Sequence, residues 1–103
     1  MATYYHTAYE QLKSHDPELY RELLNWVRFG STDSNLVNAA IRNNFEEVMC
    51  HRNYEDMDTL IALAKTLYNY VPREAWKEHA NIINWEKQRQ ITPWPEFEFG
   101  KML

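Results

Sequence analysis

The sequence has 103 residues, enough for one domain, and a chain of this size buries roughly two thirds of its unfolded surface on folding. Apolar residues make up 45% of it and aromatic residues 15%, which is too rich in large apolar groups for a disordered chain. The formal net charge of −4 gives no overall attraction to nucleic acid or to anionic lipid. These values favour a folded protein and disfavour general binding of DNA.

The one cysteine, Cys50, excludes an intramolecular disulfide and indicates a reducing compartment. The first residues carry neither a basic start nor an apolar run, and no segment approaches the roughly 18 apolar residues of a membrane span. We therefore expect a cytoplasmic protein that makes no contact with a membrane.

Apolar residues at helical spacing predict a short first helix over residues 4–13. The signals for the second helix are the clearest in the chain. Asp16 is a capping residue, Pro17 suits the first helical position, and Gly30 is typical of the left-handed residue after a helix. A helix over residues 17–29 follows from these signals.

Three more helices are expected further along the chain. Residues 36–49 repeat apolar side chains at spacings of three and four, and residues 53–70 do the same after a capping asparagine. Because proline is tolerated in a first turn, a fifth helix is expected over residues 72–89, with Trp76 and Ile83 facing inward.

The last segment, residues 92–103, has two prolines and then alternates apolar with acidic residues, which predicts extended chain. The expected fold is all-α: a compact bundle of four to five helices over residues 1–91, with this aromatic arm as part of the same domain. The arm either packs its aromatic residues across the helices or projects from them.

Acidic residues gather at one predicted helix end and the start of the next helix, where antiparallel pairing would bring them to one edge: Glu46, Glu47, Glu55, Asp56 and Asp58. They form either a solvated rim or a docking face for a basic surface on another protein. Basic residues are more frequent in the predicted last helix: Arg73, Lys77, Lys87 and Arg89. They either balance the acids or form a weak nucleic-acid patch.

The arm supplies the second candidate surface, because Trp94, Phe97 and Phe99 are aromatic side chains of the kind that anchors protein interfaces. Docking of these side chains on the domain's own core is the alternative. The four histidines are widely spaced, and Gly30 and Gly100 stand outside any glycine-rich loop. We expect no catalytic, cofactor or metal site, and therefore no enzyme.

A weak resemblance concerns the run from Tyr68 to Trp76, which follows the segment Asn53–Asp58. It resembles a pattern in small uncharacterised accessory proteins of tailed bacteriophages, where a Tyr-Asn-Tyr-x-Pro turn precedes a helix with a Trp. The resemblance covers residues 36–76, and the pattern differs afterwards because no Gly-Ser turn follows the Trp. It implies an accessory protein that binds and redirects or inhibits one host protein.

The leading hypothesis is a non-enzymatic protein-binding module, encoded by a phage and inhibiting a bacterial host or defence protein in the host cytoplasm. It would bind through the acidic edge and the aromatic anchors. The alternatives are an inhibitor that mimics DNA with its acidic edge, and a small helical protein that binds nucleic acid or a ligand. Nucleic acid is the disfavoured partner, and a homodimer is a further alternative.

Overall fold

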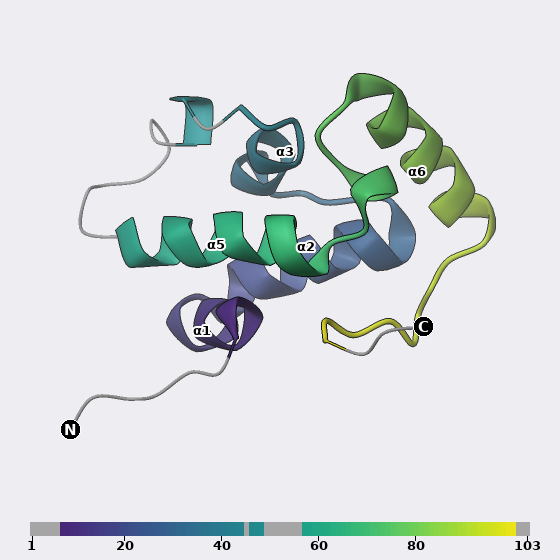
Figure 1. Ribbon diagram of the computed structural model, residues 1–103. Coiled ribbons are helices and arrows are strands. Elements are labelled where there is room, and N and C mark those ends of the chain that lie inside the picture. Colours follow the sequence, from purple (N-terminus) through teal and green to yellow (C-terminus); the bar gives the residue numbers. More distant parts are fainter. Residues whose placement is uncertain (1–6, 45, 49–56, 101–103) are drawn as a thin grey trace.

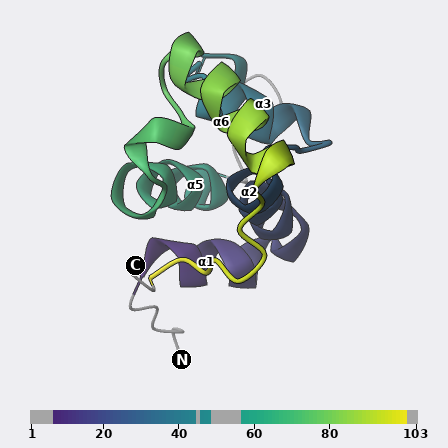
Figure 2. The ribbon, with the colours of Figure 1, turned by 90° about the vertical axis from the view of Figure 1, so that its right-hand side faces the viewer.

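A computed structural model describes residues 7–44, 46–48 and 57–100. The structure is all-α, as predicted, and the described residues contain no strand. The principal helices are α1 (Ala8–His15), α2 (Pro17–Phe29), α3 (Asn35–Ile41), α5 (Met57–Tyr70) and α6 (His79–Ile91), with a short 3-10 helix, η2 (Arg73–Ala75). Helices α2 and α5 lie side by side, α1 crosses them on one side, and α3 and α6 cover the other side (Figures 1 and 2).

Helix α2 begins and ends where the sequence predicts. The Asp16 carboxylate oxygen Oδ1 accepts a hydrogen bond from the backbone N–H of Leu19 at 3.1 Å, and Pro17 occupies the first turn. Gly30 has a φ of 68°, and its N–H donates to the carbonyl oxygen of Trp26. Local capping is therefore sufficient to define this helix.

Replacing Gly30 by alanine should lower the free energy of unfolding by at least about 1–2 kcal/mol, because a Cβ atom disfavours left-handed backbone. The new atom would also lie 2.9 Å from the carbonyl oxygen of Glu86 and 3.0 Å from Cβ of Arg89, so α6 would have to move. Urea unfolding followed by circular dichroism measures the loss. The exposed neighbour provides the control, since Ser31→Ala should change stability by less than about 0.5 kcal/mol. A Gly30→Ala variant as stable as the wild type would contradict the close packing of α2 on α6.

The first helix begins later than predicted. Its N-cap is Thr7, whose hydroxyl oxygen accepts from the backbone N–H of Glu10, and it continues to His15, two residues beyond the predicted end at residue 13. The predicted start at residues 4–6 lies outside the described residues. Helix α1 thus runs to the residue before Asp16, which caps the next helix.

The predicted helix over residues 36–49 is interrupted. Helix α3 ends at Ile41, and Asn43 takes a left-handed φ of 60°. The next residue, Asn44, accepts the backbone N–H of Glu47 and begins a new helical turn over residues 46–48. Asparagine is among the few residues that tolerate this backbone, so the break needs no glycine. The predicted Asn53 cap and Cys50 lie outside the described residues.

The predicted helix over residues 72–89 is also interrupted, since only the short η2 follows Pro72 directly. After η2, Trp76 is extended with a φ of −158°, and Lys77 is left-handed with a φ of 83°. Trp76 is 1% exposed, and its ring packs edge-on against Tyr68 with 4.9 Å between centroids. The backbone N–H of Lys77 donates to the carbonyl oxygen of Ile41. These tertiary contacts hold the segment in a non-helical form, and α6 begins only at His79.

Helix α6 is also rotated relative to the prediction. Ile82, Trp85 and Arg89 are its buried residues, whereas Ile83, which was expected to face inward, is 41% exposed. Because the predicted face was counted from Trp76, a residue outside the helix, the whole face was displaced.

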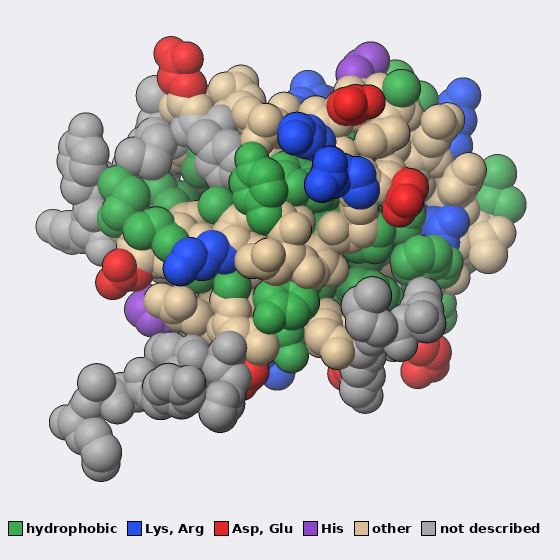
Figure 3. Space-filling view, viewed as in Figure 1, with side chains coloured by type: hydrophobic (Ala, Val, Ile, Leu, Met, Phe, Trp, Pro, Cys, Tyr) green, Lys and Arg blue, Asp and Glu red, His purple; other side chains and the backbone are tan. Residues whose placement is uncertain are grey.

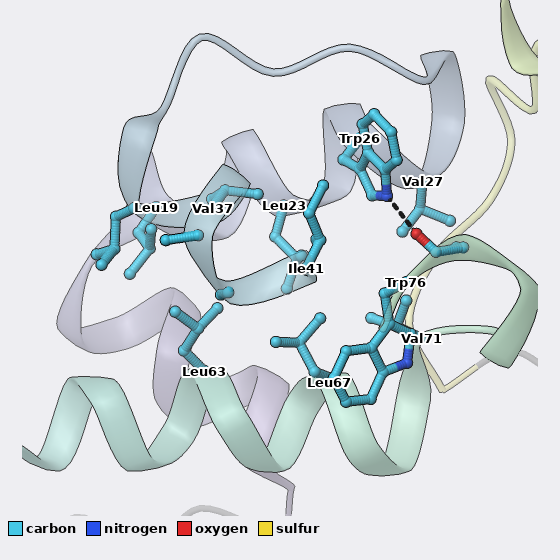
Figure 4. Packing of buried hydrophobic residues seen from close by; sticks show 14 of the residues in the cluster. Leu19, Leu23, Trp26, Val27, Val37, Ile41, Leu63, Leu67, Val71 and Trp76 are labelled. Carbon is cyan, nitrogen blue, oxygen red and sulfur yellow. Dashed lines mark hydrogen bonds between the residues drawn. The ribbon is translucent and has the colours of Figure 1, made fainter. Parts of the chain in front are cut away.

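The core lies between α2, α3 and α5 and is closed by the segment after α5 (Figure 4). Trp26 on α2 is 2% exposed, and its indole Nε1–H donates to the carbonyl oxygen of Ala75 at 2.7 Å. This bond connects α2 to η2 across 49 residues of sequence. Leu23, Val37 and Leu67 are completely buried nearby.

Candidate functional site

The described part of the arm, residues 92–100, lies against α2 and does not project from the molecule (Figure 2). The backbone N–H of Trp94 donates to the carbonyl oxygen of Arg28 at 2.7 Å, and Nε–H of Arg28 donates to the carbonyl oxygen of Phe97 at 2.8 Å. The N–H of Phe97 in turn donates to the carbonyl oxygen of Trp94, which closes a turn with Pro95 at its second position, where proline is favoured. Of the two arrangements left open by the sequence, the structure has the docked one.

Phe99 is a core residue, with 4% of its surface exposed. Its ring centroid is 5.8 Å from that of Tyr20 and 6.1 Å from that of Tyr9. Phe99 is therefore not a surface anchor while the arm is docked, which corrects the prediction for this residue. Trp94 and Phe97 are half-buried and keep part of their surface accessible.

Arg89 contacts two indole rings that are perpendicular to each other. Its guanidinium carbon lies 4.7 Å from the ring centroid of Trp85 and 4.3 Å from that of Trp94, and the two centroids are 4.9 Å apart, so α6 and the arm each contribute one ring to the contact. Trp85 is fixed in turn, because its Nε1–H is shared between the carbonyl oxygens of Trp26 and Val27 near the end of α2. Cation–π contacts of this kind are strongest where the cation is shielded from water.

The predicted basic face on the last helix does not form. Arg73 lies in η2 and Lys77 in the connection that follows it, so neither belongs to α6. Arg89 is only 7% exposed, and Lys87 is the one of the four that is an exposed residue of α6. Four cations that do not share a face give no support to a nucleic-acid patch.

The surface of the arm carries an apolar hollow of about 300 Å³, which we call the arm groove. Its lining residues are Trp94, Pro95, Glu96 and Phe97. The rings of Trp94 and Phe97 are 6.0 Å apart between centroids, and the exposed Glu96 is the charged residue among the lining residues. The groove is therefore aromatic, with one acidic residue in its lining.

The acidic edge is described only in part. Glu46, Glu47 and Asp58 are exposed, whereas Glu55 and Asp56 lie outside the described residues. Glu47 has a local role, since its carboxylate accepts from the side-chain amide of Asn44 while its N–H donates back. On the face shown in Figure 3 the coloured acidic side chains stand singly and form no continuous patch.

A second acidic group, which the sequence analysis missed, surrounds a hollow of about 240 Å³ lined by Asp16, Glu18, Leu19, Glu22, Asp33 and Ser34. Two of its carboxylates are used in the fold. Asp16 caps α2, and Glu22 accepts both the hydroxyl of Thr32 and the N–H of Asp33. Among the described residues no group of His, Cys, Asp and Glu side chains is placed to hold a metal ion.

The phenol of Tyr20 lies beneath the arm, where burial raises its pKa above the ordinary value of 10.0 and the charge of Glu98 raises it further. The ammonium of Lys13 lies 5.6 Å from the centre of the same ring. The phenol thus remains neutral over the whole physiological pH range. It serves as packing against Phe99, with a ring separation of 5.8 Å.

No helix among the described residues is long and apolar enough to cross a membrane. No family model matches the sequence, and neither a curated protein nor a solved structure was found to be similar to it.

Proposed function

We propose that the chain is a protein-binding module, and that it receives an apolar side chain of its partner in the arm groove. The observation that carries this proposal is the pair of half-buried aromatic rings, Trp94 and Phe97, around an apolar hollow of about 300 Å³. Tryptophan is among the residues most enriched in interface hot spots, and such anchors act in pockets that exclude water.

The groove is held in place before any partner arrives. Both ends of its turn are hydrogen-bonded to Arg28. Trp94 also contacts the guanidinium of Arg89 and packs perpendicular to Trp85, whose ring centroid is 4.9 Å away. A preformed groove avoids the cost of ordering a loop on binding. This makes the arm a better interaction surface than a free aromatic tail.

The charge of the groove indicates the kind of partner. Glu96 lines the hollow and is exposed, and the whole chain is acidic with a net charge of −4. Charge complementarity therefore favours a basic residue next to the apolar anchor of the partner. The narrower form of the proposal, an inhibitor of a bacterial host protein, is supported by the resemblance to phage accessory proteins.

The test is affinity capture of the tagged protein from a bacterial lysate at low and high salt, with identification of the retained protein by mass spectrometry. Glu96→Arg should reduce the stoichiometric capture at least about tenfold, because it fills one side of the groove and reverses its charge. Glu74→Arg is the matched control, since Glu74 is exposed on η2 and the change in net charge is the same.

Equal loss with both variants would assign the effect to net charge and contradict the groove. Capture that is unchanged by Glu96→Arg would show that the partner binds elsewhere. The absence of any stoichiometric partner under both salt conditions would contradict the proposal for that host.

A further inference from the structure

Arg89 is a buried cation that lacks hydrogen-bond partners at two of its guanidinium nitrogens among the described residues. Its guanidinium atoms Nε and Nη1 are fully enclosed, and within the described part of the chain neither has a hydrogen-bond partner. Buried polar groups in native proteins are nearly always paired, so a buried guanidinium with two unpaired nitrogens requires an explanation. An arginine has five N–H donors and no means of losing its charge.

The surroundings of Arg89 stabilise its charge without satisfying its donors. Two perpendicular indole rings have their centroids 4.7 Å and 4.3 Å from the guanidinium carbon, and an aromatic face attracts a cation without supplying the oxygen acceptor that its N–H groups need. Arg89 also packs beside Gly30, at the end of α2, where the helix dipole is negative. Among the residues that the structure describes, no acceptor bonds Nε or Nη1.

We propose that Arg89 is the centre of an oxyanion-binding site, for a carboxylate or phosphate group, which the docked arm covers and which opens when Trp94 lifts from the guanidinium. Planar arginine is the side chain best suited to these two groups, since its parallel N–H donors match their oxygen atoms. The proposal does not rest on the arm groove, because it concerns the surface beneath the arm.

Access to this site requires only a local movement. Two hydrogen bonds connect the turn of the arm to α2, namely Trp94 to Arg28 and Arg28 to Phe97, and the segment begins directly after the end of α6 at Ile91. A ligand that binds only the open form shifts the equilibrium toward it by mass action. Oxyanion binding and release of the arm are thus expected to be coupled.

The test measures amide hydrogen exchange of the wild-type protein by NMR during titration with inorganic phosphate. A separate titration uses acetate, and chloride at equal ionic strength is the reference. The reporter is the Trp94 amide, which donates to Arg28, and the internal reference is the Val71 amide, which donates to Thr66. Exchange at Trp94 should become about twofold faster when phosphate equals its dissociation constant for the open form, and should keep rising in proportion. Val71 should not respond.

Acceleration by both anions supports a general oxyanion site, and acceleration by one alone assigns it to phosphate or to carboxylate ligands. In Arg89→Met the response should disappear, whereas Arg73→Met, at an exposed position on η2, should retain it. A Trp94 amide that exchanges at the same rate in phosphate, acetate and chloride overturns the proposal. An equal response at Val71, or in Arg89→Met, overturns it as a general effect of ions on stability. If Arg89→Met does not fold, the wild-type comparison between Trp94 and Val71 still decides.

Discussion

Replacing Trp26 by alanine should lower the free energy of unfolding by about 3–5 kcal/mol, the usual loss for a large buried aromatic side chain. Trp26 is 2% exposed and fills the space between α2 and the segment after α5. Since small domains are stable by only about 5–15 kcal/mol, this one change should remove much of the folded population on mild heating. Urea unfolding followed by circular dichroism measures the difference.

A second substitution at the same position separates packing from hydrogen bonding. Trp26→Phe keeps an aromatic ring but removes the indole N–H, so the carbonyl oxygen of Ala75 loses its 2.7 Å bond. An unpaired buried acceptor costs about 1–3 kcal/mol, in addition to the smaller loss of volume. The exposed Ile83→Ala should change stability by less than about 0.5 kcal/mol. A phenylalanine variant with wild-type stability would contradict the role of the bond to Ala75.

The second large effect is expected in the arm. Phe99→Ala should lower the free energy of unfolding by about 3–5 kcal/mol, although the residue lies close to the end of the described chain. The reason is its burial against Tyr9 and Tyr20, with 4% of its surface exposed. Ile91→Ala is the matched control, because Ile91 is also a large apolar residue near the arm but is 82% exposed. The free energy of unfolding of Ile91→Ala should stay within about 0.5 kcal/mol of the wild-type value.

Thermal unfolding of the two variants measures this contrast. A Phe99→Ala protein with the melting temperature of the wild type would mean that the arm contributes nothing to the stability of the folded domain.

The burial of Phe99 also affects the design of binding experiments. Combined alanine substitution of Trp94, Phe97 and Phe99 would change stability and binding together, whereas Glu96→Arg alters the exposed side of the groove alone.

How far the fold could be predicted from sequence depends on whether local or distant groups end each helix. Helix α2 was predicted correctly because Asp16, Pro17 and Gly30 act on their own backbone. The break at Asn43 was missed because neither glycine nor proline marks it. The non-helical path through Trp76 and Lys77 was missed because tertiary contacts impose it. The Trp76 ring packs on Tyr68, and the N–H of Lys77 donates to the carbonyl oxygen of Ile41, which is far away in sequence.

In the candidate site, too, the sequence predicted the local features and missed those that distant contacts determine. The alternation of Phe97 and Phe99 with acidic residues marked the arm as aromatic and extended, but one ring is half-buried and the other is in the core. Residue type alone does not distinguish them. Arg89 was placed with the surface cations because arginine is seldom buried. A Trp four residues before it and a second Trp shortly after it are the signal that could have indicated a stacked arginine.

The attachment of the arm to α2 has a consequence for the order of folding. The bond between Arg28 and the carbonyl oxygen of Phe97 joins groups 69 residues apart, so closing it requires a long loop and comes late. During synthesis the part of Tyr20 on α2 that Phe99 covers stays open until Phe99 has been added, whereas Tyr9 on α1 already packs against Tyr70 of α5. Nascent chains in this interval expose apolar surface and are the species most prone to aggregation.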